Sequence, residues 1–400
     1  MIRLTAAAVL LASAAPVLAD THTIAPGEGA QERLQEALIL AEPGDEIVLE
    51  AGRFVLTDGL SLDVDGVTLR GAGMDGTILD FTTQAGAGEG LLVTSDNVTL
   101  RDFAMENPKG DGIKSKGADN IVYHAIRVTW TNGPDASNGA YAIYPVESTG
   151  VLVDGVIVSG ASDAGIYVGQ SSKITVRNSI AEYNVAGIEI ENSRDAVVEN
   201  NIARYNTGGI LVFDLPGLPV MGGGNVIVRQ NLVTENTTPN FAPPGNIVAG
   251  VLRGTGIMVM ANENVWIENN LLSDNPTAPF IIVAYTQDFT DDRYNPYPRD
   301  VVIGPNAIEG GGDDPDFAGG AQVAAAFGGA LPPILWDGLS DSDRTALYVT
   351  GGIPGWSLNL TQQGQGIENA NPSPLEAATE IEAWDMSGIG APAELATRIQ

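Results

Sequence analysis

The 400-residue chain contains no cysteine and only two histidines, His22 and His124. Without cysteine there is no disulfide framework, no thiolate nucleophile and no cysteine-based metal site. Two histidines do not support a multi-histidine metal site or a histidine-dependent catalytic triad. The stability of the protein must therefore come from its packed core.

Basic residues are also scarce, because 19 Lys and Arg stand against 50 Asp and Glu and the formal net charge is −31. Such an acidic chain is not expected to bind nucleic acid, whose phosphates are neutralised by basic side chains. A polyanionic polysaccharide would be repelled unless a cation or a local basic patch offsets the field. Three of the four lysines, Lys109, Lys114 and Lys116, fall within eight residues, which random scatter explains poorly. They either form a functional patch, the interpretation we favour, or offset neighbouring carboxylates.

The amino terminus has the features of a secretory signal peptide. Arg3 precedes an Ala/Leu/Val stretch, and Val17-Leu18-Ala19 forms a small-residue cleavage site before Asp20. We therefore expect residues 1–19 to be removed and the mature protein to be periplasmic or secreted. No other apolar stretch is long enough to predict a transmembrane segment.

A short sequence motif occurs nine times along the chain. It consists of a small residue or Pro followed by apolar-x-apolar. Three consecutive intervals are close to 22 residues, and longer intervals fit the same unit with an inserted loop. The motif begins at positions 59, 90, 112, 142, 165, 187, 209, 256 and 279. A fixed period of this size indicates a solenoid, and the absence of helical periodicity within the unit predicts an all-β, single-stranded parallel β-helix.

Alternation along each predicted strand separates an inward from an outward face. The residue after the Gly, such as Ile166 or Ile188, is apolar in all nine repeats, and the residue two further on is apolar in all but Ser115. Both columns are predicted to fill the core. A later recurring residue, Asn in positions 107, 184, 206, 236 and 275, is expected to stack at turns, because Asn tolerates left-handed backbone and can bond neighbouring backbone.

The repeats define the domain organisation. Residues 31–41 are predicted to form an amphipathic helix that caps the first coil, within a β-helix domain of residues 20–310. Residues 311–400 are expected to be an extension that packs on the end or side of this domain. The insertions 131–141, 215–224 and 237–254 are expected to wall a groove along one stack of strands.

The outward positions of the middle repeats carry the candidate site. We predict Lys114, Lys116, Tyr144, Tyr167, Glu189 and Glu191 as catalytic residues, and Glu147, Asp163, Phe213 and Asp214 as substrate-binding residues. Neighbouring rungs are about 4.8 Å apart, so Lys114 can approach Tyr144, and Tyr167 can approach Glu189.

Two reactions suit these groups. A Lys-activated tyrosine could remove the C5 proton of a uronic acid in a β-elimination, with a lysine or cation neutralising the sugar carboxylate. Alternatively, Glu189 and Glu191 could flank a glycosidic bond for hydrolysis. A structural role, in a solvated outer face, also fits these glutamates, and local backbone capping fits Asp163 and Asp214.

No metal-ligating residues are assigned. Asp313, Asp314 and Asp316 form an acidic turn, which makes Ca²⁺ the only candidate cofactor.

Six segments carry a resemblance to known proteins: Gly110–Gly117, Tyr144–Glu147, Ser159–Gln170, Ala186–Asn192, Gly209–Gly217 and Asn240–Asn246. Through them the chain resembles the right-handed parallel β-helix proteins of the pectin-lyase-like superfamily, and more closely an exported bacterial family of β-helix-repeat proteins. The resemblance covers residues 24–305. It implies a right-handed coil and an exported c-type cytochrome as a partner, but no catalytic assignment. The chain lacks the Asp-Pro-His-Asp, His-Gly with Asp-Asp, and Arg-Ile-Lys motifs of the epimerases, polygalacturonases and pectate lyases of the superfamily.

We therefore expect an exported β-helix that binds an extended polysaccharide or oligosaccharide along one outer face. Two hypotheses stay open at this point. The protein is either a lyase or glycoside hydrolase, or a non-catalytic binding or assembly module.

Overall fold

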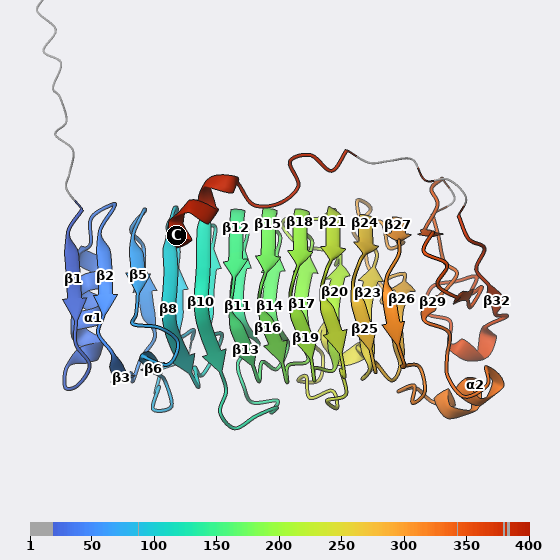
Figure 1. Ribbon diagram of the computed structural model, residues 1–400, viewed down its shortest axis with the longest axis horizontal. Coiled ribbons are helices and arrows are strands. Elements are labelled where there is room, and N and C mark those ends of the chain that lie inside the picture. The colour runs from blue at the N-terminus through green and yellow to red at the C-terminus, as the bar shows by residue number, and fades with distance from the viewer. Residues whose placement is uncertain (1–18, 87, 342, 379–380, 382–384) are drawn as a thin grey trace, which may run out of the picture.

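The computed structural model describes residues 19–86, 88–341, 343–378, 381 and 385–400. The predicted signal peptide lies outside the described residues, except for Ala19. Short strands wind into an elongated coil in which nearly every strand pairs in parallel with its counterpart one coil away (Figure 1). The all-β parallel β-helix predicted from the repeats is confirmed.

One side of the coil is a 12-stranded sheet, called the site sheet below. Its central strand pairs are in the predicted register, with Tyr144 opposite Lys114 and Tyr167 opposite Glu189. Its strands are β4 (Leu60–Leu62), β7 (Leu91–Val93), β9 (Ile113–Lys116), β11 (Tyr141–Val146), β14 (Ala164–Gly169), β17 (Ala186–Glu191), β20 (Gly208–Phe213), β23 (Thr255–Met260), β26 (Ala278–Val283), β29 (Ile334–Trp336), β31 (Gly355–Ser357) and the antiparallel β32 (Ser373–Pro374).

The other sides belong to a 20-stranded sheet, called the paired sheet below. In most coils the chain crosses it as two successive strands. They are β1 (Thr21–Ile24), β2 (Glu46–Leu49), β3 (Gly52–Val55), β5 (Thr68–Arg70), β6 (Thr77–Asp80), β8 (Thr99–Glu106), β10 (Ile121–Thr129), β12 (Thr149–Asp154), β13 (Ile157–Ser159), β15 (Ser172–Arg177), β16 (Ile180–Glu182), β18 (Arg194–Glu199), β19 (Ile202–Arg204), β21 (Gly224–Arg229), β22 (Leu232–Thr234), β24 (Glu263–Glu268), β25 (Leu271–Ser273), β27 (Arg299–Ile303), β28 (Ala307–Glu309) and β30 (Leu347–Val349).

The inward columns form a continuous apolar core, as predicted. Ile143, Ile166 and Ile188 are fully buried, as are their counterparts in the other coils. The one polar inward residue, Ser115, is also buried and hydrogen-bonds to the hydroxyl of buried Tyr123. A buried hydroxyl is tolerated here because it has a partner.

Asparagine ladders stabilise the turns, as predicted, although the left-handed backbone is found at Asn107 and not at its counterparts in the later rungs. The side-chain oxygen of Asn206 accepts from the backbone nitrogen and the side-chain nitrogen of Asn184, both at 3.0 Å, and Asn206 donates in turn to Asn236 at 3.1 Å. In the later rungs the left-handed backbone belongs to the preceding residues, among them Tyr183 (φ 59°) and Tyr205 (φ 57°). The asparagines of these rungs are therefore buried stacking residues rather than the turn residues themselves.

The predicted amphipathic helix is α1 (Ala30–Leu40), whose buried Leu34 and Leu38 close the first coil. The other helical segments are η1 (Ile247–Gly250), α2 (Gly320–Ala326), η2 (Ile367–Asn369) and η3 (Ala393–Ile399). Within the described part of the chain, no helix has the length and hydropathy needed to cross a membrane.

The β-helix extends beyond residue 310, where the repeat pattern places its end. Strands β29, β30 and β31 add rungs that pair in parallel with β26, β27 and β29. The pattern is lost there because long insertions separate the strands. The last residues then run back along the paired sheet, where Leu395 of η3 is buried against Val122 and Leu152 (Figure 1).

Candidate functional site

The predicted outward lanes lie on the site sheet, but their middle rungs are covered. Residues 237–254, called the covering loop, pack Val248 and Val251 against Leu211 and Phe213. The exposed fractions of Tyr167, Glu189 and Glu191 are consequently only 4%, 1% and 6%. The expectation of an open, solvated groove is wrong at these rungs, because the covering loop lies over the face instead of only walling it.

Three tyrosines pack together at the start of this covered region. The ring centroid of Tyr141 lies 4.4 Å from that of Tyr144 and 4.5 Å from that of Tyr167, and the rings of Tyr144 and Tyr167 are 4.9 Å apart. Glycine makes room for this arrangement, because a Cβ at Gly169 would lie 2.1 Å from the hydroxyl oxygen of Tyr167. The tyrosines form one wall around the carboxylates described next.

Sequence reasoning missed Tyr141. Strict alternation places it inside, but Ala142 and Ile143 are both in the core, so the alternation breaks at the repeat's small residue. Tyr141 therefore lies on the outer face. The sequence holds one indication of this placement. The residues that align with Tyr141 in the next two coils are the small Ala164 and Ala186, so a large aromatic side chain stands out at this position.

Asp163, Glu189 and Glu191 form what we call the carboxylate cluster. The Tyr167 hydroxyl donates to Glu191 Oε1 at 3.0 Å, and the Tyr141 hydroxyl donates to Asp163 Oδ2 at 3.4 Å. Asn246 of the covering loop also donates to Asp163 Oδ2, at 3.3 Å. The structure thus joins Tyr167 to Glu191, rather than to the Glu189 expected from the rung spacing.

Two oxygens of the cluster are buried and have no hydrogen-bond partner among the described residues, Asp163 Oδ1 and Glu189 Oε1. Burial raises the pKa of Asp163 and of Glu191 to about 7. The pKa of Glu189 is raised well above its usual value, first by burial and then by repulsion from Asp163 and Glu191. Asp163 and Glu191 can therefore hold and exchange protons near neutral pH, and burial favours the protonated form of Glu189.

The predicted lysines are paired. Lys114 Nζ lies 3.0 Å from Glu89 and 3.8 Å from Asp111, and it sits over the Tyr144 ring at 4.9 Å from the centroid. Lys116 Nζ lies 3.7 Å from Glu147. Lys114 and Lys116 therefore offset neighbouring carboxylates and are not free basic groups.

The environment of Tyr144 favours its protonated form over a lysine-activated phenolate. Burial raises the pKa of Tyr144 to about 12, and nearby Asp111 adds to the rise. Asp111, which sequence reasoning also missed, has a pKa raised to about 6 by burial. Tyr144 is thus held in its protonated form.

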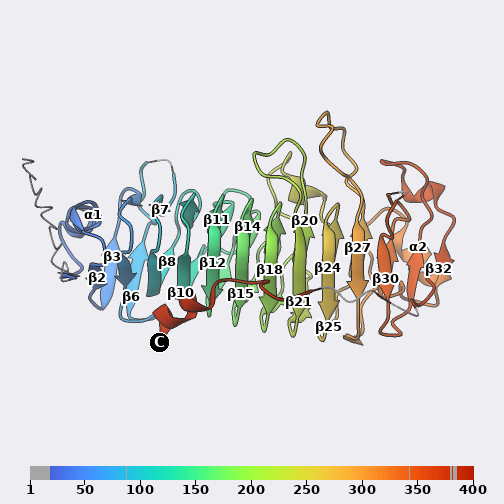
Figure 2. The same ribbon diagram turned by 90° about the horizontal axis from the view of Figure 1, so that it is seen from above.

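The remaining substrate-binding candidates have structural partners. Asp214 accepts from the Gly223 nitrogen at 2.9 and 2.8 Å and so closes the loop after β20. This loop projects from the coil beside the one between β26 and β27 (Figure 2). Phe213 is 1% exposed and packs under the covering loop, so it offers no surface to a substrate in this conformation. Only Glu147 remains partly open.

The acidic turn does not form a metal site. Asp314 pairs with Arg253 at 2.8 Å, and Asp316 accepts from the Arg253 backbone nitrogen at 3.1 Å. No group of three or more His, Cys, Asp or Glu side chains in the described ranges is arranged to hold a metal ion. The Ca²⁺ considered at Asp313, Asp314 and Asp316 is thus not supported, because Asp314 pairs with a basic side chain instead.

The chain shares its architecture with known carbohydrate-active proteins. The A-module of mannuronan C-5 epimerase AlgE6 from Azotobacter vinelandii superposes with a TM-score of 0.59 at 18% identity, over 80% of this chain and 81% of that chain. The catalytic unit of the GH87 α-1,3-glucanase from Streptomyces thermodiastaticus gives 0.53 at 15% identity, over 86% and 54%. An alginate lyase from Paenibacillus sp. gives 0.50 at 18% identity, over 74% and 97%.

Sequence comparison agrees with the fold. Residues 65–216 match the family model described as a right handed beta helix region. No curated protein sequence matches the chain. Neither the family match nor the similar structures support the expected cytochrome partner. The chain therefore has the right-handed parallel β-helix fold.

Proposed function

We propose that the protein is a glycoside hydrolase that acts on an uncharged polysaccharide or oligosaccharide at the carboxylate cluster. The observation that carries this proposal is Glu189, a fully buried carboxyl with one oxygen lacking a partner among the described residues, beside two further carboxyls with raised pKa values. Buried unpaired carboxyls destabilise a fold, so their retention favours a functional role.

Hydrolysis needs one carboxyl that keeps a proton and a second that acts as base or nucleophile. Glu189 is the better acid because its burial is complete and two neighbouring carboxyls oppose its ionisation. Glu191 is the better second group, since the Tyr167 hydroxyl stabilises its charged form. Two residues apart on β17, their Cα atoms are about 6.5–7 Å apart, which does not select retention or inversion.

An uncharged glycan fits better than a uronate. The two lysines nearest the site are paired with Glu89, Asp111 and Glu147. The surrounding chain carries a net charge of −31, which opposes approach of a polyanion. β-Elimination by a tyrosine base is also less well supported, because Tyr144 and Tyr167 have raised pKa values.

Substrate entry requires displacement of the covering loop. Its polar contact with the cluster is the Asn246 hydrogen bond to Asp163, and its apolar contacts are Val248 and Val251. Opening the loop would expose the cluster, and closing it would exclude water from the acids.

We also propose that the protein acts outside the cytoplasm, in the periplasm or after secretion. The support is the signal-peptide pattern of residues 1–19. Amino-terminal sequencing of the protein recovered from its native host should begin at Asp20. Recovery of the intact amino terminus from the cytoplasm would contradict export.

The function is tested with a panel of neutral and uronate-containing glycans, scored for binding and for products. Hydrolysis predicts new reducing ends from a neutral glycan without absorbance from an unsaturated uronide, and loss of product in Glu191→Gln. Unsaturated uronide would select elimination instead. Binding without any product across the panel would select a non-catalytic binding module.

A further inference from the structure

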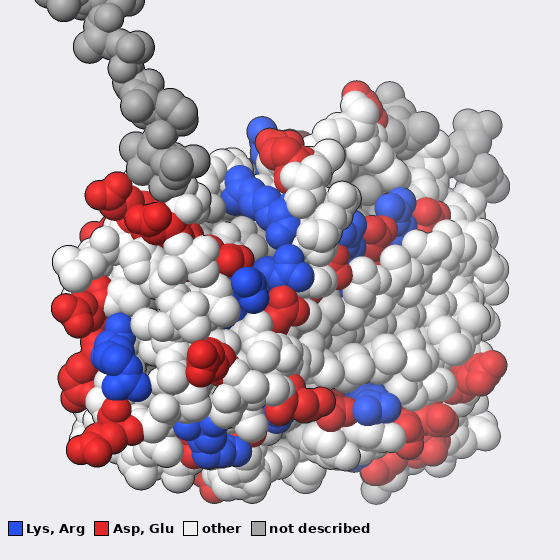
Figure 3. Space-filling model, turned by 60° about the vertical axis from the view of Figure 1, so that its left-hand side comes forward, with Lys and Arg blue, Asp and Glu red and all other residues white. Residues whose placement is uncertain are grey.

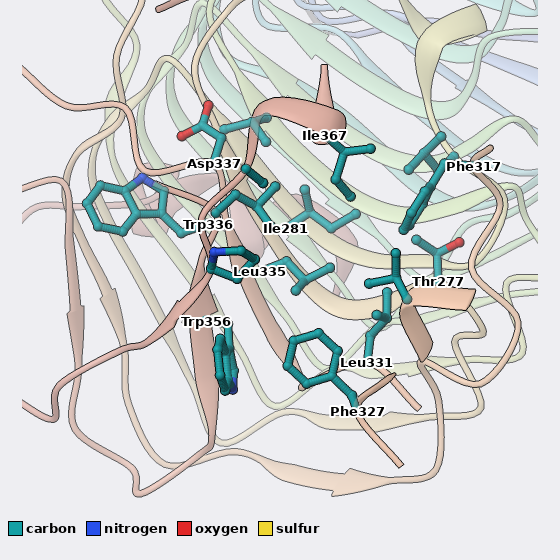
Figure 4. A pocket seen from close by; sticks show the side chains of 16 residues that line it. Thr277, Ile281, Phe317, Phe327, Leu331, Leu335, Trp336, Asp337, Trp356 and Ile367 are labelled. Atoms are coloured by element: carbon teal, nitrogen blue, oxygen red, sulfur yellow. The ribbon is translucent and has the colours of Figure 1, made fainter. Parts of the chain in front are cut away.

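A separate cavity of about 480 Å³ lies further along the outer face of the site sheet, and we call it the C-terminal pocket. Strands β26, β29 and β31 contribute Ile281, Leu335 and Trp356, and Val323 of α2 and Phe327 form another wall. Figure 4 shows Phe327, Leu335 and Ile281 directed into one shared space. The volume lies in the usual range for small-molecule sites.

Apart from the indole nitrogen of Trp356, the polar side chains of this pocket already have protein partners. The Thr277 hydroxyl donates to the Arg253 carbonyl, and the two oxygens of Asp337 accept from the Ala284 and Leu339 nitrogens at 2.6 and 2.9 Å. The Trp336 indole nitrogen donates to the Leu339 carbonyl at 3.2 Å. A sugar hydroxyl placed here would lose its hydrogen bonds to water without gaining a partner from these groups, so the pocket favours hydrocarbon.

The pocket also lacks a counter-charge. Among the described residues that line it, none is Lys or Arg, and the only ionisable one is Asp337. A free fatty acid or a phosphate would find no cation there. The rings of Phe327 and Trp356 already contact each other edge to face, with centroids 4.9 Å apart. Most other lining side chains are aliphatic, so an alkyl chain fits better than an aromatic ring.

The pocket and the carboxylate cluster are joined by the same loop and the same sheet. Asn246 of the covering loop contacts Asp163, whereas Leu252 of that loop lines the C-terminal pocket. Between them lies a smaller cavity of about 210 Å³, and Val283 lines both cavities. Glu189 and Ile281 are three rungs apart, which is about 14 Å.

We infer that the C-terminal pocket binds an uncharged alkyl chain carried by the glycan whose sugar part reaches the carboxylate cluster. The alkyl site is argued from the pocket alone, and only its connection to a sugar substrate rests on the proposed function. One ligand would then lie along the site sheet with its polar end at Glu189 and its apolar end beyond Ile281.

The experiment measures binding of n-alkyl β-D-glucosides from butyl to octyl, below their micelle concentrations, by calorimetry and by tryptophan fluorescence. Trp336 and Trp356 line the pocket and provide the optical signal. The affinity should rise roughly fourfold for each added methylene until the pocket is full. Phenyl glucoside should bind more weakly than hexyl glucoside, which has the same number of aglycone carbons.

Two variants localise the effect. Ile367→Glu places a charge at a lining position that is 36% exposed, and Ala370→Phe fills part of the space. Each should lower octyl glucoside affinity by roughly tenfold. Ile39→Glu, on the exposed face of α1 at the other end of the coil, is the matched control and should bind as wild type.

A wild-type affinity independent of chain length would overturn the inference, as would a chain-length effect that survives both pocket variants. Tighter binding of phenyl than of hexyl glucoside would overturn the alkyl assignment. Concentration-dependent dimers that Ile367→Glu dissociates would show that a second copy fills the pocket, again overturning it. Glu189→Gln should retain the chain-length effect. If wild type shows that effect but cleaves no glycan, the proposed hydrolase fails while the alkyl site stands.

Discussion

The outer faces of the paired sheet and of the site sheet differ in the partners that they give to acidic side chains. On the paired sheet, Asp154, Glu182 and Glu199 each pair with an arginine one rung away, at 2.7 to 2.8 Å. Basic side chains lie beside acidic ones on the surface seen in Figure 3. On the site sheet, Glu189 lies between Tyr167 and Leu211 instead.

The backbone does not explain this difference, because both sheets have parallel strands in the same rung spacing. The paired sheet shows how the fold accommodates an outward carboxylate when only stacking is required. The carboxylate cluster departs from that solution at a cost in stability, which supports selection for chemistry at these positions.

The largest expected effect compares glutamates of the two faces. Glu189→Gln should lower kcat on a cleaved glycan on the order of 10³-fold, because the amide cannot donate the acid's proton. The matched variant Glu199→Gln, on the paired sheet, should leave kcat unchanged. Rates are measured with the substrate found in the glycan panel. Equal losses in both variants would show that the two faces do not differ in chemistry.

The next effect is on the pH dependence of stability. Burial raises the folded-state pKa of Glu191 to about 7, above the usual 4.5 of a glutamate. Since the native state binds this proton more tightly, its contribution is fully present below pH 4.5 and is lost as the pH rises through 7. At pH 8 the loss is on the order of 3 kcal/mol.

Urea unfolding at pH 5 and pH 8 measures this loss in the free energy of unfolding. Glu191→Gln should reduce the loss between the two pH values by the Glu191 share and leave the part that comes from Asp163 and Glu189. Glu199→Gln should follow wild type apart from its lost ion pair. A Glu191→Gln profile parallel to that of wild type would contradict the assigned shift.

A smaller effect tests the close packing of the site sheet. Gly169→Ala should displace the Tyr167 ring from Glu191 and lower the free energy of unfolding by about 2 kcal/mol. The control is Gly250→Ala, where no atom lies within 4 Å of the new Cβ. Thermal unfolding compares the two, and similar melting temperatures would argue against the steric contact.

The smallest effect is expected on the paired sheet. Arg177→Ala should reduce the free energy of unfolding by less than about 1 kcal/mol, because the arginine is partly exposed and solvent screens its pair with Asp154. Added salt should shrink the difference from wild type further. A loss of several kcal/mol would mean that the paired sheet depends on these ion pairs far more than their exposure indicates.

The candidate site was predictable in its position but not in its environment. Tyr144, Tyr167, Glu189 and Glu191 lie on the expected face because the repeat period sets the register. Their burial was not predictable, since the covering loop comes from a distant part of the chain. The hydrogen bond from the Tyr167 hydroxyl to Glu191 was also not predictable. It forms because Gly169 has no Cβ, which leaves room for the Tyr167 ring beside Glu191.

The sequence alone determined the coil, its inward columns and the face that carries the chemistry, because these follow from short-range alternation and a regular period. Only the tertiary structure decided that the lysines are paired, that the carboxylate cluster is covered and that an apolar pocket lies further along the same sheet. Those features arise from insertions, whose paths depend on long-range packing that no repeat encodes.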